Sequence, residues 1–249
     1  MNNFKGLITG LSGGFFGGLI GLGGGIIMIP LMVIWLKLNQ LKAHGTSLVA
    51  VVFAGLFGAT AYFYHGTIDL KVACILATTA AITARFGAVF AHSMPERKLK
   101  KSFGIFLIFV SLLLIGKGYI FQTTVNTNLW LRIFIFLATG GLTGFISGMM
   151  GVGGGTIMIP PMVILAHMPQ QMAQGTSLVA MVPVGFIGAY THYKFGNVEK
   201  RIAPGLIVGA ALGSFLGGST ANLIPEFYLK LLFSIVLVWM GIHFIKISR

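Results

Sequence analysis

Long apolar segments follow one another along this chain, and only short polar stretches separate them. Hydrophobic residues fill 56% of its 249 positions, whereas charged residues fill only 8%. A water-soluble domain of this length cannot bury so many apolar side chains and still cover its surface with polar groups. A lipid bilayer suits such a chain better, so the sequence predicts an all-α polytopic membrane protein.

The chain is duplicated at a constant offset of 130 residues. Residues 21–50 and 151–180 are identical at 19 of 30 aligned positions, and the hexapeptide GTSLVA occurs in both. Internal repeats of this kind are typical of transporter folds. We therefore expect one membrane repeat at 1–121 and a second at 130–249, joined by an inter-repeat loop at 122–129.

Each repeat divides into five apolar segments, which predicts eight to ten transmembrane segments in total. They lie at 4–20, 26–38, 45–65, 70–91 and 102–121, and again at 130–150, 156–168, 175–195, 202–221 and 227–247. Most approach the ~20 residues that span ~30 Å of hydrocarbon. The second segment of each repeat is shorter and reaches only ~20 Å as a helix. We expect it to form a hairpin with the first segment.

Lysine and arginine residues indicate how the repeats lie in a membrane. If the hairpin returns to its starting face, each repeat crosses an odd number of times and the second repeat is inverted. One face then collects 12 basic residues and the other collects 4, whereas a single long span in place of the hairpin gives 9 against 7. Only the hairpin satisfies the positive-inside rule, so we predict inverted repeats with both termini cytoplasmic. The larger set is Lys5, Lys37, Lys42, Arg97, Lys98, Lys100, Lys101, Lys194, Lys200, Arg201, Lys246 and Arg249, and the smaller set is Lys71, Lys117, Arg132 and Lys230.

A glycine cluster joins the two arms of each hairpin, as GLGGGIIMIP at 21–30 and GVGGGTIMIP at 151–160. A break at membrane depth is tolerated only where it is buried in protein or lines a cavity. The first N–H groups of the short helix carry the positive end of its dipole, and glycine lets a ligand approach them. A small anion suits such a place. The expected contact residues are Gly23, Gly24, Gly25, Ile26, Gly153, Gly154, Gly155 and Thr156.

The GTS tripeptides at 45–47 and 175–177 begin the third apolar segment of each repeat. Thr46, Ser47, Thr176 and Ser177 either cap that helix or offer hydroxyl groups to the bound anion. Arg85 is the one basic residue well inside an apolar segment. It either extends to the nearby membrane surface or attracts anions at the cytoplasmic mouth.

Three histidines, His44, His65 and His192, lie at the ends of predicted helices. They act either as interfacial anchors or as proton carriers. The sequence has no HExxH motif, Walker motif or Ser-His-Asp order with an acid at membrane depth, which argues against an enzyme. We expect no cofactor and no metal, and the net charge of +13 does not require nucleic acid, because the positive-inside rule explains it.

The paired GxGGGxxxxP motifs, Gly21–Pro30 and Gly151–Pro160, are each followed by GTS about fifteen residues later. In this pattern the chain resembles the TauE/SafE family of membrane transporters over essentially its whole length. The resemblance implies a multi-pass protein of the plasma (inner) membrane that exports sulfite or an organosulfonate. Its partners would be small inorganic or organosulfur anions and membrane lipids, and a homo-oligomer is left open.

Export also agrees with elementary electrostatics. A cell interior negative by ~100 mV favours the exit of an anion by ~2.3 kcal/mol per unit of charge. Together with the resemblance, which implies the sulfur-containing substrate, this predicts a secondary transporter that exports small sulfur-containing oxyanions by alternating access around the two glycine breaks. The alternatives left open are a proton-coupled anion importer that uses the histidines, a channel, and a membrane subunit that anchors a soluble partner.

Overall fold

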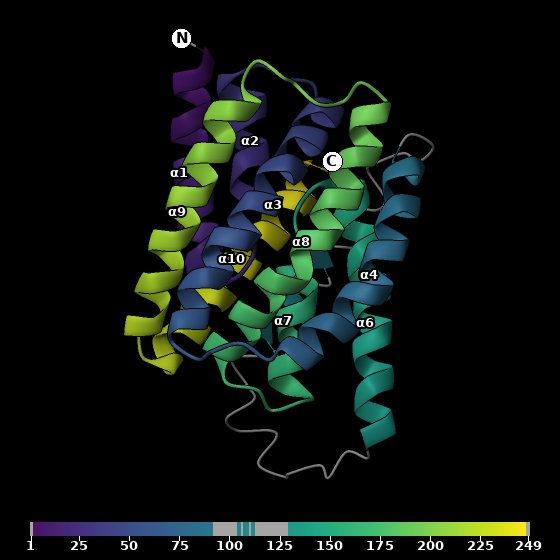
Figure 1. Ribbon diagram of the computed structural model, residues 1–249, viewed down its shortest axis with the longest axis vertical. Coiled ribbons are helices and arrows are strands. Elements are labelled where there is room, and N and C mark those ends of the chain that lie inside the picture. Colours follow the sequence, from purple (N-terminus) through teal and green to yellow (C-terminus); the bar gives the residue numbers. More distant parts are fainter. Residues whose placement is uncertain (1, 92–103, 106, 110, 113–128, 248–249) are drawn as a thin grey trace.

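The computed structural model describes residues 2–91, 104, 105, 107–109, 111, 112 and 129–247, and these residues form helices joined by turns (Figure 1). No strand occurs among them, so the all-helical fold is confirmed. The helices are α1 (Asn2–Ile20), α2 (Gly25–Trp35), α3 (Gln40–Tyr64), α4 (Leu70–Phe90), α6 (Leu129–Met150), α7 (Gly155–Ile164), α8 (Gln170–Lys194), α9 (Ala203–Leu223) and α10 (Glu226–Ile247).

Six of these helices, α3, α4, α6, α8, α9 and α10, are long and apolar enough to cross a membrane. The helices α2 and α7 are apolar but have only 11 and 10 residues. At ~1.5 Å per residue, a helix of this length covers about half of the hydrocarbon thickness. The predicted segment at 102–121 falls largely outside the described residues.

Stripes of small residues bring two pairs of helices into close contact. Gly10 and Gly14 of α1 lie against the backbone of Leu206 and Ala210 in α9. The contacts advance in the same direction along both helices, so α1 and α9 run parallel. In the same way, α6 of the second repeat packs on α4 of the first through Gly140, Gly144 and Gly148. Small residues are the usual means of close helix packing in membranes, where apolar side chains alone give little drive to associate.

The helices α3 and α8 pack against each other in the middle of the bundle and run in opposite directions. Gly55 of α3 lies against the carbonyl of Leu178, whereas Gly185 of α8 lies near the carbonyl of Leu48. An offset of 130 residues converts α3 into α8, so the two copies of this helix are antiparallel. The orientation of the repeats relative to a membrane stays a prediction.

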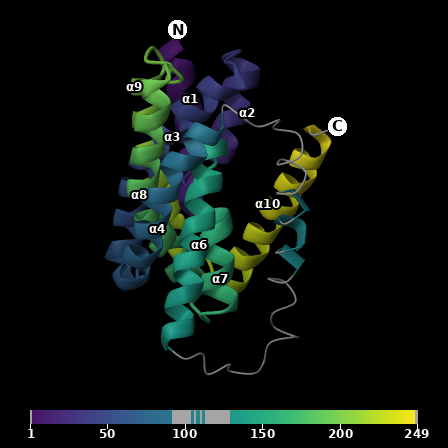
Figure 2. The ribbon, with the colours of Figure 1, turned by 90° about the vertical axis from the view of Figure 1, so that its right-hand side faces the viewer.

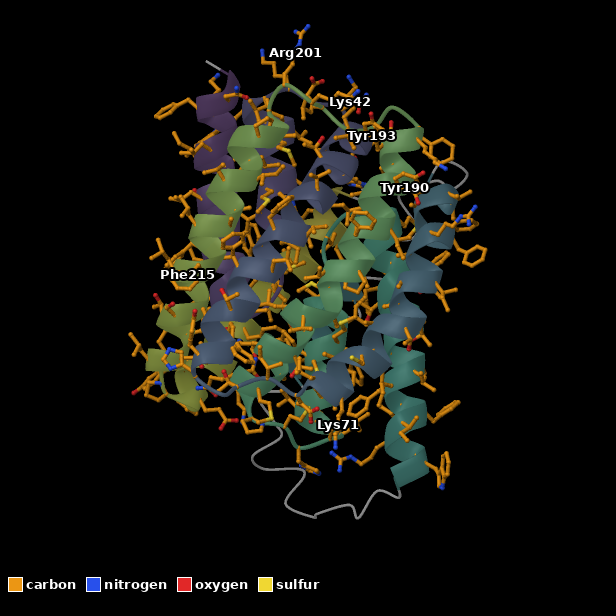
Figure 3. All side chains as sticks on the ribbon, viewed as in Figure 1. Lys42, Lys71, Tyr190, Tyr193, Arg201 and Phe215 are labelled. Atoms are coloured by element: carbon orange, nitrogen blue, oxygen red, sulfur yellow. The ribbon has the colours of Figure 1, made fainter. Side chains whose placement is uncertain are left out.

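Basic residues gather at one end of the bundle. Arg201 and Lys42 lie at the end that carries the N-terminus, whereas Lys71 lies at the opposite end (Figure 3). The helix α10 leans away from the other helices toward the same end as the N-terminus (Figure 2). The positions of Arg201, Lys42 and Lys71 agree with the two sets predicted from the sequence.

Candidate functional site

The two glycine clusters form tight turns inside the bundle, as the hairpin prediction requires. In the first repeat, Gly17 lies directly against Gly24, so α2 folds back along α1. Gly23 and Gly24 have φ of 72° and 82°, and Gly153 in the second repeat has φ of 80°. Residues with a Cβ rarely adopt this left-handed conformation, so glycine is required there. The short helices begin at Gly25 and Gly155, one residue before the predicted starts.

The two turns also pack directly against each other. Gly25 lies against the carbonyl oxygen of Gly151, and Gly155 lies against the carbonyl oxygen of Gly21. A Cβ at either position has no space, because a backbone atom of the other repeat already occupies it. The glycines at 25 and 155 therefore permit a turn-on-turn contact, whereas the sequence pattern predicts contact with an anion at these two positions.

Two serines of the GTS tripeptides fix this crossing. The hydroxyl of Ser177 lies 2.7 Å from the carbonyl oxygen of Gly21, and that of Ser47 lies 2.9 Å from the carbonyl oxygen of Gly151. Each hydroxyl also approaches a carbonyl one turn earlier in its own helix. A hydroxyl has one proton to donate, so each serine divides that proton between two carbonyls.

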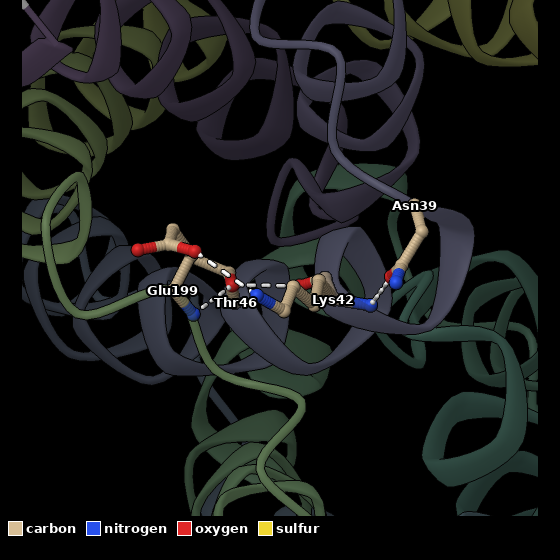
Figure 4. Close-up of polar contacts among 4 residues, drawn as sticks. All are labelled: Asn39, Lys42, Thr46 and Glu199. Atoms are coloured by element: carbon tan, nitrogen blue, oxygen red, sulfur yellow. Dashed lines mark hydrogen bonds and ion pairs between the residues drawn. The ribbon is translucent and has the colours of Figure 1, made fainter.

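The GTS threonines bind backbone N–H groups of the opposite repeat. The N–H of Glu199 donates to Thr46 Oγ1 at 2.9 Å, and the N–H of Asp69 donates to Thr176 Oγ1 at 2.9 Å. The cap of α3 is Asn39, whose side chain accepts from the N–H of Lys42 at 2.8 Å (Figure 4). The interpretation of these threonines as caps of their own helices is therefore wrong. The helix already starts at Gln40, which places GTS in its second turn.

The glycines of both turns and the two GTS serines meet at this crossing, whereas the GTS threonines contact Glu199 and Asp69 instead and Arg85 lies elsewhere. The glycines of both turns and all four GTS hydroxyl residues are buried. Arg85 is exposed on α4, on a face that also exposes Ile82 and Phe86. The role of Arg85 in attracting anions stays a prediction, and none of the contacts that the structure describes at the crossing involves this residue.

Two of the three histidines are buried rather than interfacial. His44 is 4% exposed and His192 is 0% exposed, whereas His65 is exposed at the end of α3. His192 Nε2 lies 3.0 Å from the carbonyl oxygen of Gly148. The interpretation of His44 and His192 as interfacial anchors is wrong, since both lie inside the bundle.

A cavity of about 210 Å³ opens beside the crossing. It is lined mainly by apolar side chains and includes residues from both glycine turns. Its lining consists of Ile26, Ile29, Pro30, Val33, Ile34, Gln40, His44, Met150, Val152, Trp239, Met240 and His243. A cavity that borders both turns is the kind of space that the sequence predicted for a ligand.

Met181 of α8 lies between the two glycine turns, and sequence reasoning missed it. The N–H of Gly154 donates to Met181 Sδ at 2.8 Å, and the same side chain lies close to Gly23 of the other turn. Met181 is fully buried. Thioether sulfur is a weak acceptor on a flexible side chain. It therefore leaves the Gly154 N–H available to a stronger acceptor.

A second cavity of about 380 Å³ lies at the basic end of the molecule. Three cationic side chains, Lys5, Lys37 and Arg201, line it together with Glu199. The carboxylate of Glu199 is already paired with Lys42 at 3.3 Å. This cavity therefore carries a net positive charge.

An all-helical bundle with several membrane-spanning helices and two broken helices that meet inside it defines a membrane transporter. The chain matches the family described as sulfite exporter TauE/SafE over residues 6–244. It belongs to the TauE/SafE family, as the paired glycine motifs predicted.

Relatives in the family are described as probable membrane transporter proteins. The chain is 28% identical to YunE of Bacillus subtilis, with 96% of each chain covered. It is 30% identical to a protein of Xylella fastidiosa strain 9a5c, with 85% of this chain and 83% of that protein covered. It is 27% identical to a protein of the archaeon Methanocaldococcus jannaschii, over 79% of this chain and 74% of that protein. No solved structure matches the chain.

Proposed function

We propose that this protein exports small sulfur-containing oxyanions, such as sulfite or an organosulfonate, across the inner membrane. Transport would proceed by alternating access, with the glycine turns at the centre of the movement. Both termini would lie in the cytoplasm, together with the basic end of the bundle.

The reciprocal crossing of the two turns is the observation that carries this proposal. It brings two helix N-termini, of α2 and α7, next to each other inside the bundle. Broken helices at the interface of two repeats are where transporters bind their substrates, and helix N-termini favour anions. The few hydrogen bonds that hold the turns together, such as the one from Ser177 to Gly21, allow the halves to separate without breaking a large polar network.

The electrostatics of the bundle supports export rather than uptake. The basic cavity at the predicted cytoplasmic end would raise the local concentration of anions at the entrance. The membrane potential then favours their exit. Among the described residues, no acidic side chain lies within the middle of a membrane-spanning helix, so the structure offers no carboxylate at that depth for proton coupling.

Flux of radiolabelled sulfite in proteoliposomes, with and without an imposed potential, tests the proposal. We expect flux that saturates, responds to the potential and is competed by related oxyanions. Correctly folded protein that shows no saturable flux for sulfite, thiosulfate or an organosulfonate would exclude this function.

Uptake coupled to protons is the second candidate, and the position of His44 favours it. This histidine is buried and lines the cavity beside the crossing, where it could exchange a proton with a bound ligand. Flux driven by a pH gradient at zero potential, and lost in His44→Gln, would support this candidate over export. Glutamine is the residue at the equivalent position of the second repeat, 174.

A further inference from the structure

The two repeats differ in the identity and burial of side chains at the positions that flank the crossing. Reciprocal hydrogen bonds, Ser47 to Gly151 and Ser177 to Gly21, show that positions related by the offset of 130 occupy equivalent environments. The first repeat therefore serves as an internal reference for the second. A buried polar atom that lacks a partner in only one repeat is not required by the shared fold.

Three positions of the first repeat line the cavity beside the crossing, namely Ile26, Gln40 and His44. Their equivalents in the second repeat are Thr156, Gln170 and Gln174. These three side chains are 1%, 0% and 0% exposed. Only the first of these positions changes from apolar to polar, since Gln40 and Gln170 are the same residue and His44 is replaced by another polar residue. The second repeat differs because its glutamine is fully buried, whereas Gln40 is only partly buried beside an open cavity.

Each of the three has a buried polar atom with no hydrogen-bond partner among the described residues. The atoms are Thr156 Oγ1, Gln170 Nε2, Gln170 Oε1 and Gln174 Nε2. The side chain of Gln174 is held by the hydroxyl of Tyr62, which lies 3.1 Å from Gln174 Oε1. Whichever way this amide is turned, one of its two polar atoms faces Tyr62 and the other stays without a partner. Native proteins rarely leave such groups unpaired, because each costs about 1–3 kcal/mol.

Two of these side chains, Thr156 and Gln174, also lie near the positive end of a helix dipole. Thr156 lies in the first turn of α7, a helix of 10 residues, next to Gly155. Gln174 lies against Gly21, and Gly21 in turn lies against Gly155. The equivalent helix of the first repeat, α2, has the apolar Ile26 at this place. Hydroxyl and amide donors at a helix N-terminus are suited to the oxygens of a small anion.

We propose that the oxyanion site is one-sided and belongs to the second repeat, with Thr156, Gln170 and Gln174 as its side-chain donors and the α7 N-terminus as its positive pole. The inference rests on the proposed function for the chemistry of the ligand, a small anion with several acceptor oxygens. The first repeat supplies the wall of the site through the Gly21–Leu22 segment, and its own cavity is not where the anion binds.

Sulfite binding to the purified full-length protein in detergent tests this site, with thermal unfolding measured on the same samples. Thr156→Val and Gln170→Met remove hydrogen-bonding atoms with little change in volume. We expect each to weaken sulfite binding by at least about tenfold, the effect of losing one hydrogen bond to a charged group. We expect neither to lower the unfolding temperature in the absence of sulfite, because the removed atoms have no protein partner.

Two control variants separate this role from a general effect of substitution. Gln40→Met makes the same change at the equivalent position of the first repeat, and Thr143→Val removes a buried hydroxyl that already donates to Thr139 at 2.7 Å. Both should bind sulfite like the unmodified protein. If Gln40→Met weakens binding as much as Gln170→Met, the site is symmetric and the inference is wrong.

The outcome for this inference is distinct from that for the proposed function. Sulfite binding that depends on Thr156 and Gln170, without any flux, would keep the site and reject the exporter. Saturable flux together with unchanged binding in both variants would keep the exporter and reject the site. Failure of the unmodified protein to bind sulfite, thiosulfate or sulfate would overturn the one-sided oxyanion site.

Discussion

Ser177 Oγ lies 2.7 Å from the carbonyl oxygen of Gly21, which is 156 residues earlier in the chain. The equivalent pair, Ser47 and Gly151, lies 2.9 Å apart, so each repeat holds the glycine turn of the other. The contact is buried, and each carbonyl would otherwise lack a side-chain donor from the opposite repeat. This exchange of hydrogen bonds joins the two repeats at the candidate site.

Replacing these serines should lower the stability of the fold. We expect Ser177→Ala and Ser47→Ala each to cost about 1–3 kcal/mol, the penalty for leaving a buried carbonyl without its donor. Unfolding in detergent, followed by heat or by denaturant, measures the change. Thr60→Ala removes an exposed hydroxyl that donates within α3 and should cost far less. Equal losses for Thr60→Ala and Ser177→Ala would contradict the bridging role.

Alanine should not be accepted where the two turns meet. In Gly25→Ala and Gly155→Ala the added methyl group would meet a carbonyl oxygen of the other turn. Neither backbone can shift without opening the crossing, so we expect little folded protein by size-exclusion chromatography. Gly141→Ala is the control, because its methyl group would have only Thr83 Cγ2 nearby, at 4.0 Å. Normal yields of the Gly25→Ala protein would show that the turns are not in firm contact.

Removing the sulfur of Met181 should make anion binding tighter. Met181→Leu keeps most of the side-chain volume but leaves the Gly154 N–H without an acceptor in the ligand-free protein. A bound oxyanion would then regain a hydrogen bond worth about 1 kcal/mol, which corresponds to roughly fivefold higher affinity for sulfite. The control is Met32→Leu, which changes a buried methionine of a separate cluster that also contains Ala43 and Ile202. Weaker binding in Met181→Leu would mean that the sulfur contributes to the site rather than competing with the ligand.

The basic cavity should affect the rate of transport in a salt-dependent manner. We expect the double variant Lys5→Gln and Arg201→Gln to reduce the initial rate of sulfite flux from the cytoplasmic side at low ionic strength. The difference should shrink near 1 M salt, where the Debye length is about 3 Å. Lys71→Gln at the opposite end is the control for charge alone. A deficit that persists at high salt would indicate a direct contact with the anion instead of long-range attraction.

Much of this architecture could be predicted from the sequence. The offset of 130 residues gave the two repeats, and the short segments after the glycine clusters gave the hairpins that the structure contains. Both features depend on local properties, namely the length of an apolar segment and the conformational freedom of glycine. The division of basic residues between two ends was also predictable, since it follows from the number of crossings in each repeat.

What the sequence could not show was how the two repeats meet. The sequence pattern placed GTS at the start of the third apolar segment of each repeat. The structure extends each helix over residues 40–44 and 170–174, buries GTS, and brings its serine against the glycine turn of the other repeat.

The sequence by itself determined the membrane class, the duplication and the glycine turns, because each is encoded by residues close together in the chain. Only the tertiary structure decided that Gly25 faces Gly151, that Met181 accepts the Gly154 N–H, and that Arg85 is exposed on α4. These relationships depend on the packing of helices more than a hundred residues apart, where several arrangements satisfy the same hydrophobic pattern. Close packing between small residues selects one of them.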